Sequence, residues 1–137
     1  MKKIVLVITL ILLVAAPGCH LSNQKLHKKM IEKYSDDKNY VTLIGEVVEC
    51  EDNNLILNCE GLKNYLSYED DICDYFIHSK TIIDLNAGDI VHFTTVPFHF
   101  YNGHQLPIVE LKSNGNTLLS FDDGKANLIE WVNEHFQ

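Results

Sequence analysis

The side chains of this 137-residue chain that could do chemistry are concentrated in one stretch of histidine and aromatic residues. Its histidines, His92, His99 and His104, could act together, because neutral imidazole is the commonest protein ligand for zinc. One hypothesis is therefore a metal carrier or a metal-dependent enzyme. The sequence has no HExxH pattern, and diagonal strand neighbours such as His99 and His104 lie about 7–8 Å apart, which is marginal for sharing a metal. We therefore expect no cofactor and keep the metal site as an alternative.

The aromatic residues of the same stretch surround a predicted tight turn. Asn102-Gly103 is the strongest short-range hairpin signal, because both central residues of a type I′ turn need a positive φ. We predict that residues 98–101 pair with residues 106–111 across this turn. Strand alternation then places aromatic side chains on both faces of the hairpin, where one face could bind a protein or a glycan. The candidate binding residues are Phe98, Phe100, Tyr101 and His104.

Cysteines are the other reactive side chains, at positions 19, 50, 59 and 73. If Cys19 is lipid-modified, three thiols remain, and at most one internal disulfide can form. A turn at residues 52–54 does not place Cys50 opposite Cys59, whereas Cys73 could pair with either. We favour burial of these thiols as small hydrophobic groups and leave the pairing open. The sequence has no CxxC spacing, so neither a thioredoxin-like motif nor a cysteine zinc ribbon is available.

The segment that precedes Cys19, residues 1–18, has the layout of an export signal. Lys2 and Lys3 precede an apolar run over residues 4–16, and a run of this length is too short to cross a bilayer as a helix. The run ends in Ala16-Pro17-Gly18-Cys19. This stretch resembles a bacterial lipobox, and the resemblance implies that Cys19 takes a diacylglycerol and becomes the new N-terminus. The alternative is a freely secreted protein that is cleaved after Ala16.

Composition excludes several classes of function. The chain has 11 basic and 19 acidic residues, a formal charge of −8, and every basic residue is lysine. A nucleic-acid partner is not expected, because such surfaces need dense positive charge and usually guanidinium groups. The absence of arginine also excludes an arginine finger for phosphoryl transfer. No phosphate loop, GxSxG elbow or convincing Ser/His/Asp order is present, so we predict a non-catalytic protein.

The segment that follows Cys19 differs in charge from the rest of the chain. Over residues 22–35, four lysines against Glu32 give a local charge of +3, and the remainder of the mature chain carries −13. Leu26, Met30 and Tyr34 recur at helical spacing, so we predict a helix with an apolar stripe, which Ser22 could cap. Such a helix would favour anionic lipid headgroups. A solvated helix or a flexible tether over residues 19–39 is the alternative.

The body of the chain, residues 40–137, reads as short strands joined by tight turns. We predict strands over residues 40–50, 55–59, 74–78, 90–96, 98–101, 106–111 and 116–121, with a short loop or helix near residue 62. We expect Gly45 to mark a bulge or bend. A C-terminal helix capped by Asp122 or Asp123 would present Leu128, Ile129, Val132 and Phe136, with Trp131 alongside.

This pattern predicts a mainly β domain, a small antiparallel barrel or sandwich with a helix at each end. Residues 43–49, 55–57 and the Leu85-x-x-Gly88-Asp89-x-Val91 step resemble bacterial exported modules with an OB-like fold. The resemblance implies a five-stranded coiled sheet with an extra hairpin and helix. Members of such a fold bind oligosaccharides, oligonucleotides or proteins, so the fold alone does not give a function.

The sequence therefore favours a lipid-anchored binding module that lies outside the cytoplasmic membrane. Its expected partners are the membrane, through the lipid on Cys19, and a protein or glycan ligand. A structural envelope lipoprotein, which keeps surfaces apart by the repulsion of its acidic body, is a further alternative.

Overall fold

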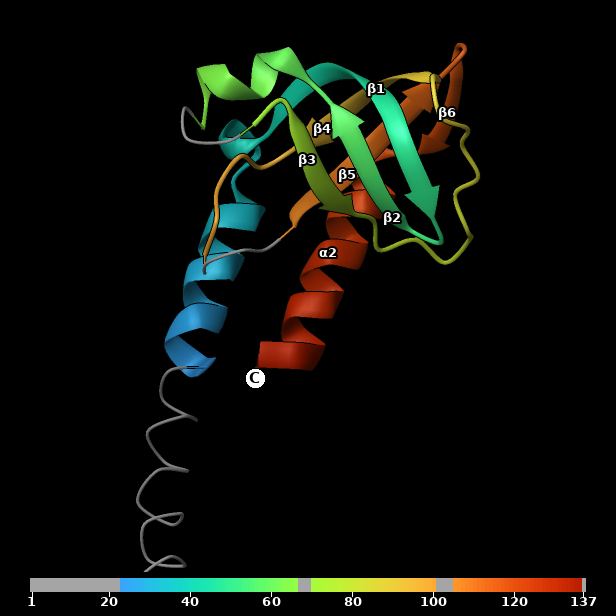
Figure 1. Cartoon of the computed structure of the whole chain (residues 1–137). Helices are drawn as coiled ribbons and strands as arrows, with labels where there is room; N and C mark the ends of the chain where they lie inside the picture. The colour runs from blue at the N-terminus through green and yellow to red at the C-terminus, as the bar shows by residue number, and fades with distance from the viewer. Residues whose placement is uncertain (1–22, 67–69, 101–104, 137) are drawn as a thin grey trace, which may run out of the picture.

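The structure is a computed structural model that describes residues 23–66, 70–100 and 105–136. These residues form one six-stranded sheet and two helices longer than two turns, so the prediction of a mainly β domain with a helix at each end is confirmed (Figure 1). The strands are β1 (Val41–Glu51), β2 (Asn54–Asn58), β3 (Ile72–Phe76), β4 (Ile90–Thr95), β5 (Leu106–Ser113) and β6 (Asn116–Leu119). The helices are the N-terminal helix, described over residues 23–35, α2 (Phe121–Phe136), and the short 3-10 helices η1 (Asp37–Asn39) and η2 (Glu60–Asn64).

The strands lie in the order β3-β2-β1-β4-β5-β6, and neighbours in this order are antiparallel. In addition, β3 pairs with β5 in parallel, with Tyr75 opposite Leu106. β5 and β6 are joined by a tight turn at Asn114-Gly115, and both residues have positive φ, 53° and 77°. That conformation matches the right-handed twist of the flanking strands.

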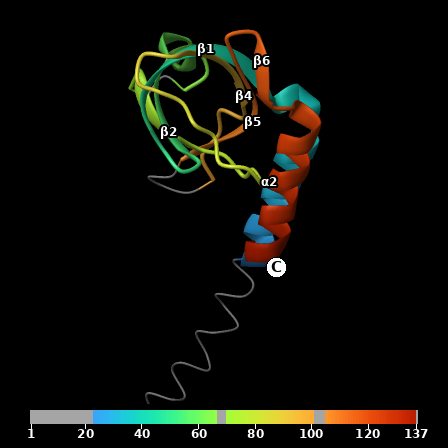
Figure 2. The same cartoon turned by 90° about the vertical axis from the view of Figure 1, so that its right-hand side faces the viewer.

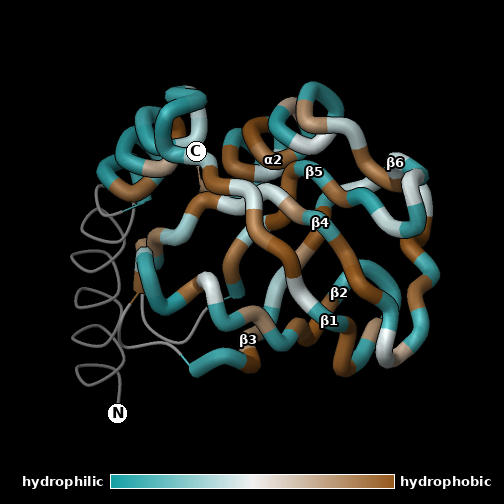
Figure 3. The backbone as a smooth tube through the Cα atoms, turned by 90° about the horizontal axis from the view of Figure 1, so that it is seen from above, coloured by the Kyte–Doolittle hydropathy of each residue, from teal (hydrophilic) through white to brown (hydrophobic). Residues whose placement is uncertain are grey.

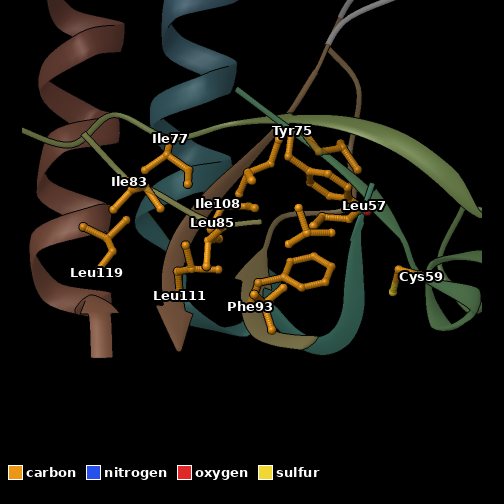
Figure 4. Packing of buried hydrophobic residues seen from close by; sticks show 14 of the residues in the cluster. Leu57, Cys59, Tyr75, Ile77, Ile83, Leu85, Phe93, Ile108, Leu111 and Leu119 are labelled. Atoms are coloured by element: carbon orange, nitrogen blue, oxygen red, sulfur yellow. The ribbon is translucent and has the colours of Figure 1, made fainter. Parts of the chain in front are cut away.

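The first hydrophobic core lies on the inner face of the curved sheet (Figure 4). Along β2 every second residue is buried in it, whereas β5 is buried at most positions because it is covered on both faces. Figure 3 shows the hydropathy of each residue along the backbone. Leu57, Phe93 and Leu111 are fully buried there, and the ring of Tyr75 meets Phe93 edge-on with centroids 5.1 Å apart.

The two helices form a second layer and run antiparallel, side by side (Figures 1 and 2). His27 Nε2 lies 2.8 Å from Asn133 Oδ1 at one end of the pair, and Lys125 Nζ donates to the backbone oxygen of Ser35 at the other. The second core fills the space between the helices and the sheet. Its buried residues are Met30, Tyr34, Val96, Val109, Leu128 and Val132. The predicted apolar stripes of both helices are therefore confirmed.

The predicted hairpin around Asn102-Gly103 is wrong in its pairing. Residues 97–100 are not in a strand, and β5 pairs with β4 and β3 instead, so that Leu106 lies opposite Tyr75 and not opposite the segment that follows β4. Pro97 ends the β4 ladder because it has no N–H to donate. The chain then leaves the sheet, and Phe100 packs against Tyr34 of the N-terminal helix with ring centroids 5.4 Å apart.

Local details also differ from the sequence predictions. The bulge in β1 lies between Val47 and Glu49 and not at Gly45. At Gly45 a Cβ atom would lie 3.2 Å from the ring of Phe93, so the glycine makes room for the core.

The start of α2 and the bounds of the third strand are corrected as well. The backbone N–H of Asp123 donates to Ser120 Oγ at 3.3 Å, so Ser120 caps the helix in place of Asp122 or Asp123. The strand predicted over residues 74–78 covers Ile72–Phe76.

Candidate binding site

The candidate site is a hollow of about 360 Å³ between the N-terminal helix and the segment that follows β4. We call it the Phe98 pocket, and its lining residues are Lys29, Glu32, Lys33, Asn39, Phe98 and Phe100. The helix contributes charged groups and the segment after β4 contributes two aromatic rings. Two of the candidate binding residues predicted from the sequence, Phe98 and Phe100, therefore lie together.

Phe98 and Phe100 form the aromatic wall of the Phe98 pocket, and Tyr34 of the N-terminal helix supports this wall. The ring of Phe100 lies edge-on to Phe98, with centroids 4.8 Å apart, and it also packs on the buried ring of Tyr34. Phe98 itself is 41% exposed. One aromatic ring thus anchors the segment in the second core, and the other remains available to a ligand.

The positive wall of the Phe98 pocket is contributed by Lys29 and Lys33. The ammonium of Lys33 lies 4.5 Å above the centre of the Phe98 ring, a cation–π contact that fixes a long flexible side chain. Lys29 is exposed one helical turn earlier, on the same face as Lys33. Glu32 also lines the pocket, so its three charged side chains give it a net charge of +1.

The far rim of the Phe98 pocket is fixed by hydrogen bonds at the end of the N-terminal helix. Asn39 Nδ2 donates to the backbone oxygen of Lys33 at 2.8 Å, and the Tyr40 hydroxyl donates to the backbone oxygen of Tyr34 at 2.6 Å. Burial, and then the charge of nearby Asp37, raise the pKa of the Tyr40 phenol, so it remains a donor. These bonds satisfy carbonyl groups that the end of a helix would otherwise leave without partners.

The other residues predicted from the sequence either do not line the Phe98 pocket or lie outside the described residues. His92 is exposed on β4, opposite Ile44 of β1 and Lys112 of β5. His99 lies on the segment after β4. Cys19, Tyr101 and His104 lie outside the described residues. Within the described ranges, no group of three or more histidine, cysteine or acidic side chains is placed to hold a metal ion.

Cys50, Cys59 and Cys73 form no disulfide within the described residues, and all three pack against the first core. Cys59 is buried, and burial is the main reason that its pKa is raised, so this thiol stays protonated. Cys50 and Cys73 are partly buried, and each lies near a backbone oxygen, that of Ile83 at 3.4 Å and that of Asp70 at 2.9 Å. These contacts are typical of cysteines that fill space.

Sequence reasoning missed a second cluster, which lies where β3 ends beside α2. The His78 ring stacks on the Trp131 indole with centroids 4.7 Å apart, and Phe76 and His135 flank the stack. His78 Nε2 is buried, and it has no hydrogen-bond partner among the residues that the structure describes. Burial, and then the proximity of His135, lower the pKa of His78 to about 4, so the ring is neutral at pH 7. These residues are far apart in sequence, and no motif joins them.

Within the described ranges, neither helix combines the length and the apolar composition needed to span a bilayer. No family model, curated protein or solved structure matches the chain.

Proposed function

We propose that this protein is a non-catalytic binding module, anchored by a lipid on Cys19 outside the cytoplasmic membrane. The observation that carries the proposal is the Phe98 pocket, which joins Phe98 and Phe100 to the basic helix that follows the proposed anchor. The pocket thus offers a positive charge beside an exposed aromatic ring, and aromatic residues are enriched at protein interfaces.

We further propose that the sheet is an OB-like barrel. The pairings support this reading, because β1, β2, β3, β5 and β4 each pair with the next, and β4 returns to β1. The strands curve around the first core in the view of Figure 2, which is consistent with closure of a sheet. In this reading β6 and α2 extend the barrel.

The chemistry of the Phe98 pocket favours a peptide segment with a carboxylate next to an apolar side chain. The carboxylate would lie between Lys29 and Lys33, and the apolar group would pack on the free edge of Phe98. A glycan is less well matched, because sugars stack on open aromatic faces and Lys33 covers one face of the Phe98 ring.

Selection from a library of random peptides tests the proposed pocket. The mature chain should enrich peptides that combine acidic and aromatic residues, and Phe98→Ala and Lys33→Gln should each weaken the enriched peptides at least tenfold. Leu118→Ala is the matched control, because Leu118 is an exposed apolar residue of β6 outside the pocket. Enriched peptides that bind both variants as tightly as the parent would refute the site. Binding on a glycan array that depends on Phe98 would assign the pocket to glycans instead.

Intact-mass spectrometry of the protein purified from its native membranes tests the anchor. A mass that begins at Cys19 and includes acyl chains is expected. An unmodified chain that begins at Pro17 would mean free secretion.

A further inference from the structure

The N-terminal helix carries a lysine face without ionic partners. Lys25, Lys28 and Lys29 are exposed, and none of them forms an ion pair in the described part of the chain. By contrast, Lys63 of η2 pairs with Asp71, and Lys112 pairs with Glu110 on β5. The positive charge of this protein is thus concentrated at the start of the mature chain, where Glu32 is the single acidic residue among residues 22–35.

The distance of this face from the proposed anchor is short. Asn23, the first described residue, follows Cys19 by four positions, and a stretch of this length spans at most about 14 Å when fully extended. Lys28 lies five positions further along the helix, a rise of about 8 Å. The lysine face therefore lies within reach of the headgroup layer if Cys19 is acylated.

Glu130 and Glu134 of α2 lie near the end of the helix pair where Asn133 meets His27, but they do not face the N-terminal helix. Contacts through Lys125 and Asn133 define the side of α2 that meets the N-terminal helix. Glu130 and Glu134 line a separate hollow with His78. The carboxylates of α2 are consequently directed toward the β3 end and not toward the lysine face.

We propose that the lysine face (Lys25, Lys28 and Lys29) seats this end of the helix pair on an anionic phospholipid surface. The rest of the mature chain, with five lysines against 18 acids, carries −13 and is repelled by the same surface. Attraction at one end and repulsion at the other orient the molecule with its sheet away from the bilayer. For its orientation the inference rests on the proposed anchor, whereas the affinity of the lysine face for lipid does not.

Vesicle co-sedimentation measures this affinity without the acyl chain. The mature chain with Cys19→Ser retains every described element, and vesicles of pure phosphatidylcholine are compared with vesicles in which phosphatidylglycerol replaces a third of the phosphatidylcholine. Binding is expected only to the anionic vesicles, and it should weaken as salt is raised toward about 0.5 M.

The double variant Lys25→Gln/Lys28→Gln spares both lysines of the Phe98 pocket. Each lysine near an anionic surface contributes about 1 kcal/mol, so the two substitutions together should cost about 2 kcal/mol. Because about 1.4 kcal/mol corresponds to a tenfold change in affinity, the affinity for anionic vesicles should fall about 30-fold. The matched control Lys63→Gln/Lys112→Gln removes the same amount of charge from η2 and β5, away from the lysine face, and should leave binding unchanged. Equal losses in both double variants, or equal binding to neutral vesicles, would overturn the inference.

The orientation is tested with the acylated protein in anionic bilayers. Trp131 is the only tryptophan of the chain and lies on α2 close to the level of the lysine face, because Asn133 of α2 meets His27. Energy transfer from Trp131 to a headgroup-attached acceptor should be strong, and Lys25→Gln/Lys28→Gln should reduce it. Transfer that is unaffected by the variant would refute the orientation. An unacylated native protein would refute the anchor and leave the vesicle result to be judged separately.

Discussion

Helix α2 crosses β5 at Gly124, where the two backbones are in contact. A Cβ atom at this position would lie 1.8 Å from the backbone oxygen of Val109 and 2.4 Å from its carbonyl carbon. Ordinary carbon–oxygen contacts are about 3.3–3.6 Å, so in Gly124→Ala the helix or the strand must move by about 1.5 Å. The obstacle is backbone, and no side-chain rotation can relieve the clash.

Two opposing effects determine how much Gly124→Ala changes the free energy of unfolding. Alanine in place of glycine favours a helix by up to about 1 kcal/mol. Overpacking costs about 1–3 kcal/mol and sometimes more, and a backbone obstacle places this site at the upper end. We therefore expect Gly124→Ala to lower the free energy of unfolding by at least about 2 kcal/mol, which corresponds to a fall in Tm of roughly 6–12 °C for a domain of this size.

Urea unfolding followed by circular dichroism, together with a thermal scan, measures this effect. Ala126→Gly on the exposed side of the same helix is the control, and it should cost about 1 kcal/mol through helix propensity alone. If Gly124→Ala stabilises the protein, propensity governs this position and the deduced close contact of α2 with β5 is refuted. If the packing argument is right, the same variant should also weaken peptide binding at the Phe98 pocket, because Tyr34 and Leu128 share the second core.

Three further outcomes are expected. Because the folded pKa of His78 lies below its ordinary value of 6.5, the unfolded chain binds more protons between pH 6.5 and about 4, and stability falls as the pH drops through that window. The ceiling on this loss of stability is about 3 kcal/mol, and about 1–2 kcal/mol is expected for a partly exposed ring. His78→Phe should flatten the pH dependence of the urea midpoint between pH 6.5 and about 4, and a pH dependence equal to that of the parent would refute the assignment. Tyr40→Phe leaves the Tyr34 carbonyl without its hydroxyl donor and should cost about 1–2 kcal/mol in urea unfolding, so an unchanged midpoint would show that solvent replaces the bond. Leu57→Ala empties a fully buried site of the first core and should cost about 2–5 kcal/mol, and a loss below about 1 kcal/mol would show that this core collapses around the cavity.

Much of the local structure could be predicted from short-range patterns. The spacing of Leu26, Met30 and Tyr34 predicts the N-terminal helix and its buried face, since side chains three to four positions apart lie on one side of a helix. Asn114-Gly115 predicts a turn between strands, because the requirement for positive φ is a property of those two residues. The charge difference between residues 22–35 and the remainder is likewise fixed by composition.

Strand pairings and side-chain contacts between residues that are distant in the sequence were determined only by the tertiary structure. Asn102-Gly103 predicts a turn as strongly as Asn114-Gly115, yet residues 97–100 leave the sheet, because β4 and β3 already pair with β5 and Phe100 gains burial against Tyr34. The same packing brings Lys33 to Phe98, although the two residues lie far apart in the sequence. No local pattern encodes that contact, because the free energy that favours it comes from covering the second core as a whole.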